Sequence, residues 1–325
     1  TPLLSRSSHC YPVEADVILA TTAGEVDFME RGILEDKTDA PGSSLQHTLD
    51  RISLLMPGTH EPQVISAACA SSTVALAQAA NMIRTGQSKC VLVLAADSVT
   101  EFVFSGFSAL MALDPDTARP FDANRRGLSL GEAAALALVT SDTRAQAEQW
   151  PVAAEIAGYG ITNDANHMTG PSRDGEGLSI AVERALAMAD VAPSSIESIS
   201  AHGTGTVYND SMEMKAFKRV FGTIPVPTYS VKGAIGHTLG AAGLIEALVA
   251  IHSLSECTIP PTAGLLAPAP DAAGWVSSSA VSTRGTGSTL STNSGFGGIN
   301  AALVLRRASG GLLLPDPRRC SGGIR

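Results

Sequence analysis

A repeated alternation of apolar segments with alanine-rich segments constrains the fold of this chain more than any other feature. Four apolar segments lie in the first half, at residues 16–23, 63–67, 90–95 and 133–140. Such segments predict buried strands, whereas the alanine-rich residues 70–84, followed by Gly86, predict a helix that the glycine ends. Strands separated by helices favour a largely parallel sheet with helices on its faces.

The same alternation restarts in the second half of the chain. It predicts two helices, at 177–189 and 241–254, and three strands, at 195–201, 228–231 and 301–305. Because both halves show the same alternation of strands and helices, we expect two halves of similar fold, although the sequence shows no clear repeat. We therefore expect an α/β protein with halves at 1–145 and 146–307 and a loosely ordered tail at 308–325.

Composition narrows the class of protein. Of the 325 residues, 44% are hydrophobic and 16% are charged, which suits buried strands covered by helices and argues against disorder. The formal charge of −9 disfavours binding to nucleic acid and insertion at anionic membranes, and charges interrupt each apolar run too early for it to cross a bilayer. The five cysteines form no CxxC pair, so we expect reduced thiols in a cytoplasm and no cysteine-bound metal.

Cys69 lies in the segment Ser-Ala-Ala-Cys-Ala-Ser-Ser, where a predicted strand passes into a predicted helix. At such a junction, unpaired backbone N–H groups and the positive end of the helix favour the thiolate, which is the form that attacks a thioester. Small neighbours allow a sharp turn and close approach of a substrate. A buried structural cysteine is the alternative interpretation, so Cys69 alone does not define a site.

Two glycine-rich segments of the second half carry histidines. His202 opens the segment His-Gly-Thr-Gly-Thr at the end of a predicted strand, where Thr204 and Thr206 offer hydroxyl groups. His237 follows Lys232 in Lys-Gly-Ala-Ile-Gly-His-Thr-Leu-Gly. This second segment does not match a phosphate-binding GxxxxGK[ST] loop, because its lysine precedes the glycines. A satisfied histidine in a polar turn is the alternative for His202.

A fourth segment, Asn-Ser-Gly-Phe-Gly-Gly-Ile-Asn at 293–300, leads into the last predicted strand. It places Phe296 among three glycines, which make the backbone conformationally permissive. The segment is either an ordinary turn or a mobile aromatic gate whose amide helps to hold an oxyanion.

Together and in this order, the four segments resemble the elongating β-ketoacyl-[acyl-carrier-protein] synthases, which belong to the thiolase superfamily. That family is built around one cysteine, two histidines and a lysine, which fall here on Cys69, His202, His237 and Lys232. Supporting stretches are Arg-Pro-Phe-Asp at 119–122 and Asn-Asp-Ala-Asn-His-Met-Thr at 163–169. The resemblance implies a thiolase-like layered α-β-α-β-α fold of two similar halves.

The resemblance also implies a reaction, a decarboxylative Claisen condensation. An acyl group on Cys69 would be extended by two carbons from malonyl-acyl-carrier protein, in fatty acid or polyketide assembly. The amides of Cys69 and Phe296 would hold the oxyanion, and His202 and His237 would assist decarboxylation as donors from Nε2. No metal or other cofactor is implied, because the substrates are carried on phosphopantetheine.

Further assignments rest on the resemblance alone. Lys232 would order the histidines through acidic partners, and the expected supporting acids are Asp210, Glu213 and Glu246. The expected substrate-binding residues are Thr204, Thr206, Phe107 and His167. The apolar residues 102–111 would contribute to the pocket and to a dimer interface. The expected partners are an acyl-carrier protein and a second synthase subunit, either identical or related.

Three departures from the family pattern stand out. The family has a further strand, expected to be central in its sheet, and helices before residue 16, so the first half is expected to be incomplete unless another polypeptide supplies them. Ser294 stands where a phenylalanine usually precedes the gate, which leaves the chain-length preference open. Met111 stands where an arginine commonly meets the carrier, so we expect docking near Arg125 and Arg126 instead.

Three alternative functions are weighed against the enzyme. A chain-length-determining or scaffold partner in a ketosynthase heterodimer usually lacks the nucleophile that Cys69 provides. A degradative thiolase would carry a second cysteine in residues 293–300, which contain none. A non-catalytic α/β binding module is the alternative from another class, and the reactivity of the Cys69 thiol distinguishes it from an enzyme.

Overall fold

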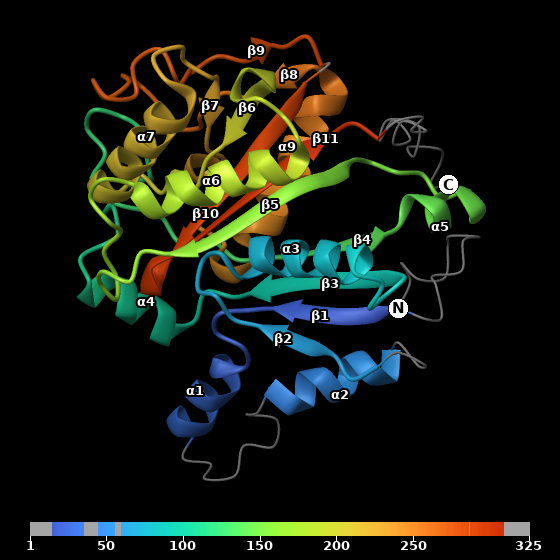
Figure 1. The fold of residues 1–325 in the computed structure, drawn as a ribbon. Helices are drawn as coiled ribbons and strands as arrows, with labels where there is room; N and C mark the ends of the chain where they lie inside the picture. Colours follow the sequence, from blue (N-terminus) through green and yellow to red (C-terminus); the bar gives the residue numbers. More distant parts are fainter. Residues whose placement is uncertain (1–14, 36–44, 56–59, 286, 309–325) are drawn as a thin grey trace, which may run out of the picture.

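Two β-sheets, one from each half of the sequence, organise the protein (Figure 1). The computed structural model describes residues 15–35, 45–55, 60–285 and 287–308. The first sheet has the order β2-β1-β3-β4. Its strands are β1 (Asp16–Ala20), β2 (Gln63–Ile65), β3 (Cys90–Asp97) and β4 (Ala133–Thr140). These four strands lie where the apolar segments predict them.

The second sheet has the order β5-β11-β10-β6-β7. Its strands are β5 (Glu155–Asn163), β6 (Ile196–Ser200), β7 (Thr228–Tyr229), β10 (Ser288–Gly295) and β11 (Ile299–Arg306). The first sheet is largely parallel, as predicted, because β2, β1 and β3 pair in parallel, whereas the second sheet has two parallel and two antiparallel pairs. β4 runs antiparallel to β3, and β11 runs antiparallel to both β10 and β5. β10 and β11 are joined by only three residues, too few for the crossover that a parallel pair requires.

Helices separate the two sheets and cover the outer face of the second one (Figure 1). α3 (Ser71–Arg84) and α9 (Ala242–Glu256) lie between the sheets and share one hydrophobic core with strands of both. Ala75 and Ala79 of α3 are completely buried there, because the small alanine side chain allows close approach. α6 (Glu176–Ala189) and α7 (Val207–Phe221) pack on the other side of the second sheet in a separate core.

Shorter elements complete the fold. The remaining helices are α1 (Val26–Leu34), α2 (Leu45–Leu55), α4 (Glu101–Ala109), α5 (Asp142–Ala147) and α8 (Lys232–Ile235). The short 3-10 turns are Pro193–Ser195, Leu239–Ala241 and Phe296–Gly298, and β8 (Thr258–Ile259) pairs with β9 (Val281–Ser282). The predicted tail, 308–325, lies outside the described residues except for residue 308, and Cys10 and Cys320 also lie outside them.

The two sheets differ at one edge. In the second sheet, β11 has β5 as its outer neighbour, whereas its counterpart in the first sheet, β4, has no outer neighbour among the described residues. A strand that corresponds to β5 would therefore pair with β4 at the edge of the first sheet, so the expectation of a missing central strand is wrong. Leu136 and Leu138 of β4 are 55% and 36% exposed on the uncovered face.

One run, Leu239–Glu256, is long and apolar enough to cross a membrane by length and composition alone. The sequence did not predict this segment as apolar enough, because Glu246 interrupts it. In the fold this segment includes α9, whose side chains pack against α3 and β10 in the interior. It is the core helix between the two sheets.

Candidate active site

Cys69 occupies a tight turn between β2 and α3. The preceding residue, Ala68, has a φ of +48°, a left-handed conformation that is unfavourable for a residue with a side chain. The Ser71 hydroxyl stabilises the turn by donating to the Ala68 carbonyl (2.6 Å) and accepting from the Ala67 N–H (2.8 Å). A Cβ on Gly295 would lie 2.8 Å from the Ala67 carbonyl oxygen, so glycine is required where β10 approaches this turn.

The Cys69 thiol is a weak acid in this environment. Its burial raises the pKa to about 11, although the charge of Lys232 and the N–H groups of Phe296 and of Cys69 itself act in the opposite direction. The N–H groups at the turn favour the thiolate, as predicted, but burial outweighs them. Both amides nevertheless face the sulfur, which is where an oxyanion on an attacked carbonyl would form.

His202 and His237 face each other beside this thiol. The two rings meet edge to face, with centroids 5.1 Å apart and planes at 83°. The Nδ1 atom of His237 accepts the Leu239 N–H (3.2 Å), and that of His202 accepts from Asn293 Nδ2 (3.1 Å). Burial lowers the pKa of both rings well below its ordinary value, and the charge of Lys232 lowers it further. Both rings are neutral at physiological pH, and their Nδ1 partners assign the proton to Nε2.

Lys232 connects the two histidine segments from a buried position. Its Nζ donates to the carbonyl oxygen of His202 (2.6 Å), lies 3.3 Å from His202 Nδ1, and forms an ion pair with Glu246 of α9. Asn293 Nδ2 donates to the other oxygen of that carboxylate (2.7 Å). Lys232 and Glu246 are each only 1% exposed, so neither charge has water to compensate it. The pair and its amide partner fix the His202 ring in one orientation.

Cys69, His202 and His237 each offer an atom that could ligate a metal, and these three atoms lie within 4.8 Å of one another. A histidine binds a metal through a ring nitrogen that carries no proton. Here the Nδ1 atoms are occupied as acceptors, and Nε2 of His237 has no partner among the described residues. With protons on Nε2, the rings suit hydrogen-bond donation to a substrate oxygen and do not suit metal ligation.

Two carboxylates of α7 hold the backbone of the His202 segment. Glu213 accepts the N–H groups of His202 (2.8 Å) and Gly203 (2.7 Å), and Asp210 accepts those of the next two residues (3.1 and 3.2 Å). Burial raises the pKa of Glu213 to about 8, and the neighbouring charge of Asp210 adds to that rise. The structure thus places Glu246, and not Glu213, against the Lys232 ammonium group.

Phe296 lies at the end of β10, where the chain turns into β11. Its ring stacks on that of Phe107 of α4, with centroids 5.5 Å apart and planes at 28°. The next residue, Gly297, has a φ of +83°, which glycine adopts without strain. Its N–H donates to the Met168 carbonyl (2.6 Å). The Ser294 hydroxyl donates to Asn300 Oδ1 (2.7 Å).

An apolar cavity of about 470 Å³ opens at the thiol. Its wall is formed by the turn after β1 (Thr22 and Ala23), by residues 102–110 of and after α4, and by Leu239, Phe296 and the Cys69 turn itself. Phe107 lies on this wall, as the resemblance implies. The volume and apolar lining are typical of a small-molecule site.

The other residues assigned to the substrate lie elsewhere. His167 is exposed and is absent from the cavity wall, and its Nδ1 accepts the backbone N–H groups of Thr169 and Gly170 (both 3.1 Å). Its role in binding substrate therefore stays a prediction, and it is not a role on the wall of this cavity. Thr204 and Thr206 also lie off the wall, with their hydroxyl oxygens 2.9 Å apart.

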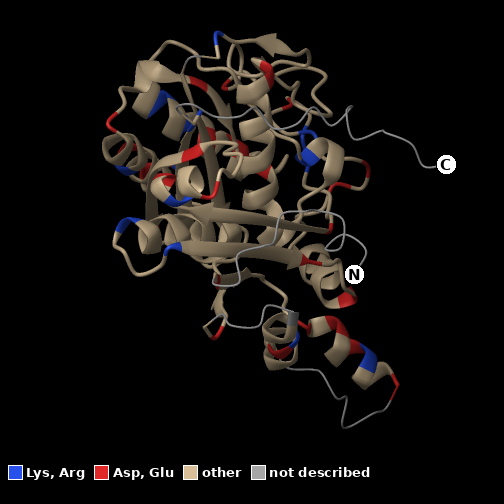
Figure 2. Ribbon diagram, turned by 90° about the vertical axis from the view of Figure 1, so that its right-hand side faces the viewer, with Lys and Arg blue, Asp and Glu red and all other residues tan. Residues whose placement is uncertain are grey.

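The expected carrier contacts near Arg125 and Arg126 are largely engaged within the protein. Arg125 is buried against α7, where it contacts Ser211 and pairs with Asp210. Arg126 is more exposed but pairs with Asp114 and Asp116. Basic positions elsewhere are scattered among acidic ones (Figure 2). The expectation of a basic docking patch at these two arginines is wrong, because their charges are neutralised by neighbouring acids.

Two residues of the site were not predicted from the sequence. Asn293 links Thr73 of α3, His202 and Glu246, although the sequence indicated only a turn. Asp97, at the end of β3, accepts hydrogen bonds from the turn after β1 and from the His237 segment. A polar residue at the carboxyl end of a predicted strand was the available signal for Asp97.

Layered sheets with a thiol between strand and helix, beside two histidines and a lysine, define a thiolase-like condensing-enzyme fold. Models of the β-ketoacyl synthase N-terminal and C-terminal domains match residues 51–145 and 153–266. The chain belongs to the β-ketoacyl synthase family.

Named relatives agree with this family. Nodulation protein E of Rhizobium leguminosarum bv. trifolii is 37% identical over 246 residues, 75% of this chain and 61% of its own length. A 3-oxoacyl-[acyl-carrier-protein] synthase 2 of Rhizobium meliloti is 35% identical over 253 residues, with 75% and 60% covered. The ishigamide ketosynthase/chain length factor structure is 31% identical with a TM-score of 0.81, with 91% and 76% covered. The chain thus spans about three fifths of the length of these curated relatives.

Proposed function

We propose that this chain carries the active site of a condensing acyltransferase, which extends an acyl group by two carbons at the expense of a malonyl thioester on an acyl-carrier protein. The observation that carries the proposal is the buried Cys69 thiol, faced by two amide N–H groups and by two neutral histidines. The name of the relative 3-oxoacyl-[acyl-carrier-protein] synthase 2 supports the reaction class and the carrier.

In the first half-reaction, the Cys69 sulfur attacks the carbonyl carbon of a carrier thioester. The amides of Cys69 and Phe296 donate to the oxyanion, which collapses with loss of the carrier thiolate, and this thiolate takes up the proton that Cys69 gives up. The acyl chain then lies in the apolar cavity.

In the second half-reaction, a malonyl thioester loses its carboxyl group as carbon dioxide, and the electron pair passes into an enolate. The Nε2–H groups of His202 and His237 donate to the enolate oxygen, which is the atom where negative charge develops. The enolate carbon attacks the acyl-Cys69 carbonyl and expels the cysteine sulfur as a thiolate, which takes up a proton from solvent. The products are carbon dioxide, a 3-oxoacyl thioester longer by two carbons, and the free enzyme.

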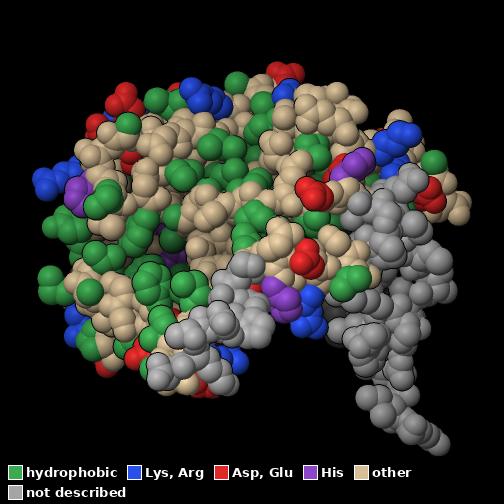
Figure 3. All heavy atoms as spheres, turned by 90° about the horizontal axis from the view of Figure 1, so that it is seen from below, with side chains coloured by type: hydrophobic (Ala, Val, Ile, Leu, Met, Phe, Trp, Pro, Cys, Tyr) green, Lys and Arg blue, Asp and Glu red, His purple; other side chains and the backbone are tan. Residues whose placement is uncertain are grey.

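A second synthase subunit, identical or related, is the partner that the exposed apolar surface favours. Ile33 and Leu34 of α1 are 77% and 74% exposed, Phe102 of α4 is 67% exposed and Met111 after α4 is 88% exposed. Hydrophobic side chains gather on the face that carries these helices, around a hollow (Figure 3). Exposed apolar groups of this size are typical of protein interfaces. Because Cys69 and both histidines are present, we assign a catalytic role to this chain.

The test is acyl transfer to the purified chain from hexanoyl-pantetheine, followed by intact mass. We expect one hexanoyl group on the wild-type protein and none on Cys69→Ala. Cys90→Ala, which removes another buried thiol, is the matched control and should be acylated like the wild type. A hexanoyl adduct of equal yield on Cys69→Ala would refute the proposal.

A further inference from the structure

The carboxylate of Asp97, at the end of β3, accepts hydrogen bonds from two separate segments. Four donors belong to the turn at residues 21–23 after β1, between 2.5 and 3.1 Å away. A fifth is the N–H of Gly240 (2.7 Å), in the segment that follows His237. Asp97 is only 8% exposed, so these bonds are shielded from water. One carboxylate therefore joins two segments that both contribute to the wall of the Cys69 cavity.

The contact between Asp97 and Gly240 is closely packed. A Cβ on Gly240 would lie 2.6 Å from Asp97 Oδ2 and 3.0 Å from the Thr22 nitrogen, so glycine is required for this approach. The preceding residue, Leu239, has a φ of +54°, a left-handed conformation that is unfavourable for leucine. Such a conformation persists only where the surrounding contacts hold it. The bond from the Gly240 N–H to Asp97 holds the peptide unit that directly follows Leu239.

Leu239 connects this strained backbone to the active site. Its side chain lines the apolar cavity, and its N–H donates to Nδ1 of His237 (3.2 Å). A neutral histidine carries one ring proton, so a donor at Nδ1 places that proton on Nε2. Nε2 of His237 is buried and has no partner among the described residues, which leaves it free to donate to a substrate oxygen. The backbone of Leu239 thus fixes the tautomer of this donor.

The main chain of His237 is held separately from its ring. Its N–H donates to the Ser129 carbonyl (2.7 Å), and its own carbonyl accepts the Gly131 N–H (3.0 Å). These bonds position the backbone but leave the side-chain torsions of the histidine free. In the described part of the chain, the Leu239 N–H is the group that hydrogen-bonds the ring. The orientation of the ring therefore depends on the conformation of Leu239.

We propose that Asp97 is a positioning residue for His237, an inference that rests on the proposed function. Through the Gly240 N–H, the carboxylate holds Leu239 in its left-handed conformation, and the Leu239 N–H holds the ring. Without the carboxylate, the peptide after Leu239 relaxes, and the ring turns or carries its proton on Nδ1. The ring then presents no N–H to the enolate oxygen, so the developing negative charge loses a donor.

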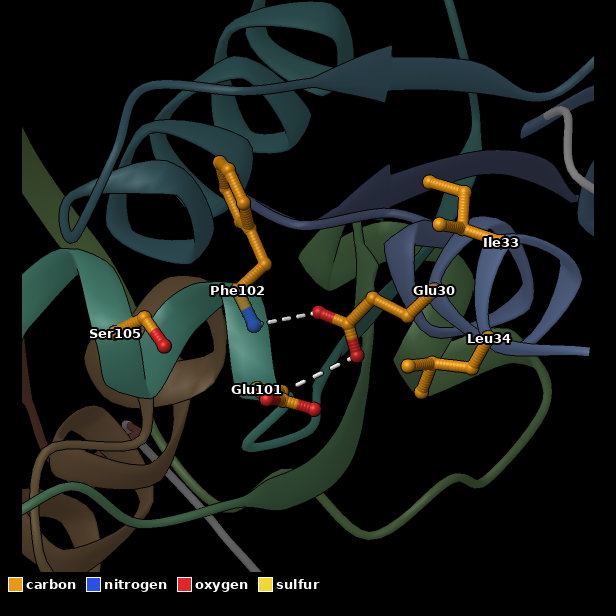
Figure 4. Close-up of a pocket in the computed structure, with 6 residues that line it drawn as sticks. All are labelled: Glu30, Ile33, Leu34, Glu101, Phe102 and Ser105. Atoms are coloured by element: carbon orange, nitrogen blue, oxygen red, sulfur yellow. Dashed lines mark hydrogen bonds between the residues drawn. The ribbon is translucent and has the colours of Figure 1, made fainter.

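A carboxylate elsewhere at the cavity offers a matched control. Glu30 of α1 accepts the N–H groups of Glu101 (3.3 Å) and Phe102 (2.6 Å) at the start of α4 (Figure 4). Glu30 lies in the groove between α1 and α4 and is not on the wall of the Cys69 cavity. Glu30→Gln and Asp97→Asn make the same chemical change to a carboxylate that accepts backbone N–H groups. Only Asp97→Asn alters a segment that holds a histidine ring.

The test measures two rates for each variant. One is hexanoyl transfer to Cys69 from hexanoyl-pantetheine, followed by intact mass, and the other is release of labelled carbon dioxide from malonyl-pantetheine. For Asp97→Asn we expect acylation within a few-fold of the wild type and carbon dioxide release slower by about tenfold to a hundredfold, because a misdirected donor loses much of its effect. Glu30→Gln should keep the wild-type ratio of the two rates.

The outcomes separate this inference from the proposed function. Wild-type carbon dioxide release in Asp97→Asn, together with slow release in His237→Ala, would overturn the inference and leave the proposed function standing. A wild-type protein that shows neither reaction would overturn the proposed function and the inference with it.

A rescue experiment separates positioning from general support of the fold. Glycine adopts the left-handed conformation without strain, so adding Leu239→Gly to Asp97→Asn should restore part of the carbon dioxide release. Leu239→Ala also shortens the side chain but keeps the strain, so as the matched control it should restore none. Equal release from the two double variants would contradict the assigned cause. If Asp97→Asn does not fold, Gly240→Ala replaces it in both experiments, because its Cβ would push the Gly240 N–H away from the carboxylate.

Discussion

The two sides of Cys69 are built in opposite ways. On the side of the second sheet, His202, Lys232, Glu246 and Asn293 are all buried and form one hydrogen-bonded network. On the side of α4, the neighbours are apolar and offer almost no polar group. The Cys69 thiol therefore lies between two environments. One positions hydrogen-bond donors, and the other excludes them.

The difference follows from what each side must stabilise. Charge develops on a substrate oxygen near the histidines, and fixed donors there need no reorganisation during the reaction. The acyl chain carries no charge, and an apolar wall gains free energy by removing it from water. The apolar side also explains why burial raises the pKa of Cys69 to about 11 despite Lys232 and the two amides.

We expect the largest change in stability from Lys232→Met, which removes the buried cation of the polar side. The substitution leaves the Glu246 carboxylate buried without its cation, and the free energy of unfolding should fall by about 3–5 kcal/mol. Burial raises the pKa of Glu246 and Lys232 lowers it, so loss of the lysine should raise the pKa of this carboxyl group further. The loss should therefore be smaller at pH 5 than at pH 8, because protonation removes the unpaired charge.

Denaturant unfolding at the two pH values measures this change. Lys218→Met removes an exposed lysine of α7 and is the matched control, with an expected change within about 0.5 kcal/mol. Adding Glu246→Gln to Lys232→Met should recover part of the loss. Equal stability of Lys232→Met and Lys218→Met would contradict the description of the polar side.

A smaller effect is expected for the reactivity of the Cys69 thiol, which depends on burial by the apolar side. Because the pKa of Cys69 is about 11, the thiolate fraction should rise about tenfold per pH unit from pH 7 to 10. The rate of Cys69 alkylation by iodoacetamide, measured by mass with Cys69→Ala as background, should follow that rise. A plateau of the rate near pH 7 would show instead that the polar side ionises the thiol.

Much of the fold follows from local sequence pattern, and the failures have physical causes. The segments 16–23, 63–67 and 90–95 are apolar and form strands, and the alanine-rich 70–84 forms α3. The strand β10 was not predicted because its sequence, Ser-Thr-Leu-Ser-Thr-Asn-Ser-Gly, is polar. The strand is nevertheless buried between two others. The antiparallel direction of β4 and β11 was also not predicted, because it depends on connections and partners and not on composition.

The residues that make up the site were predicted from the sequence, whereas the pKa of the Cys69 thiol was not. The resemblance assigned the thiol, both histidines and the lysine, and the fold brings these side chains together. Their catalytic roles stay predictions, as does the division of the chain at residue 145. The thiol pKa was missed, because desolvation depends on packing from α4 and β10 that no local motif reports. The substrate-binding role of His167 also stays a prediction, because its motif forms a turn away from the cavity wall.

The most direct test of the division between the two sides is a paired measurement on His237→Ala. Hexanoyl transfer to Cys69, followed by intact mass, reports the apolar side, and release of labelled carbon dioxide from malonyl-pantetheine reports the polar side. We predict acylation within a few-fold of the wild type and carbon dioxide release slower by about 10²–10³-fold, since one donor to the enolate oxygen is lost. Unchanged carbon dioxide release, or acylation that falls as steeply, would contradict the account.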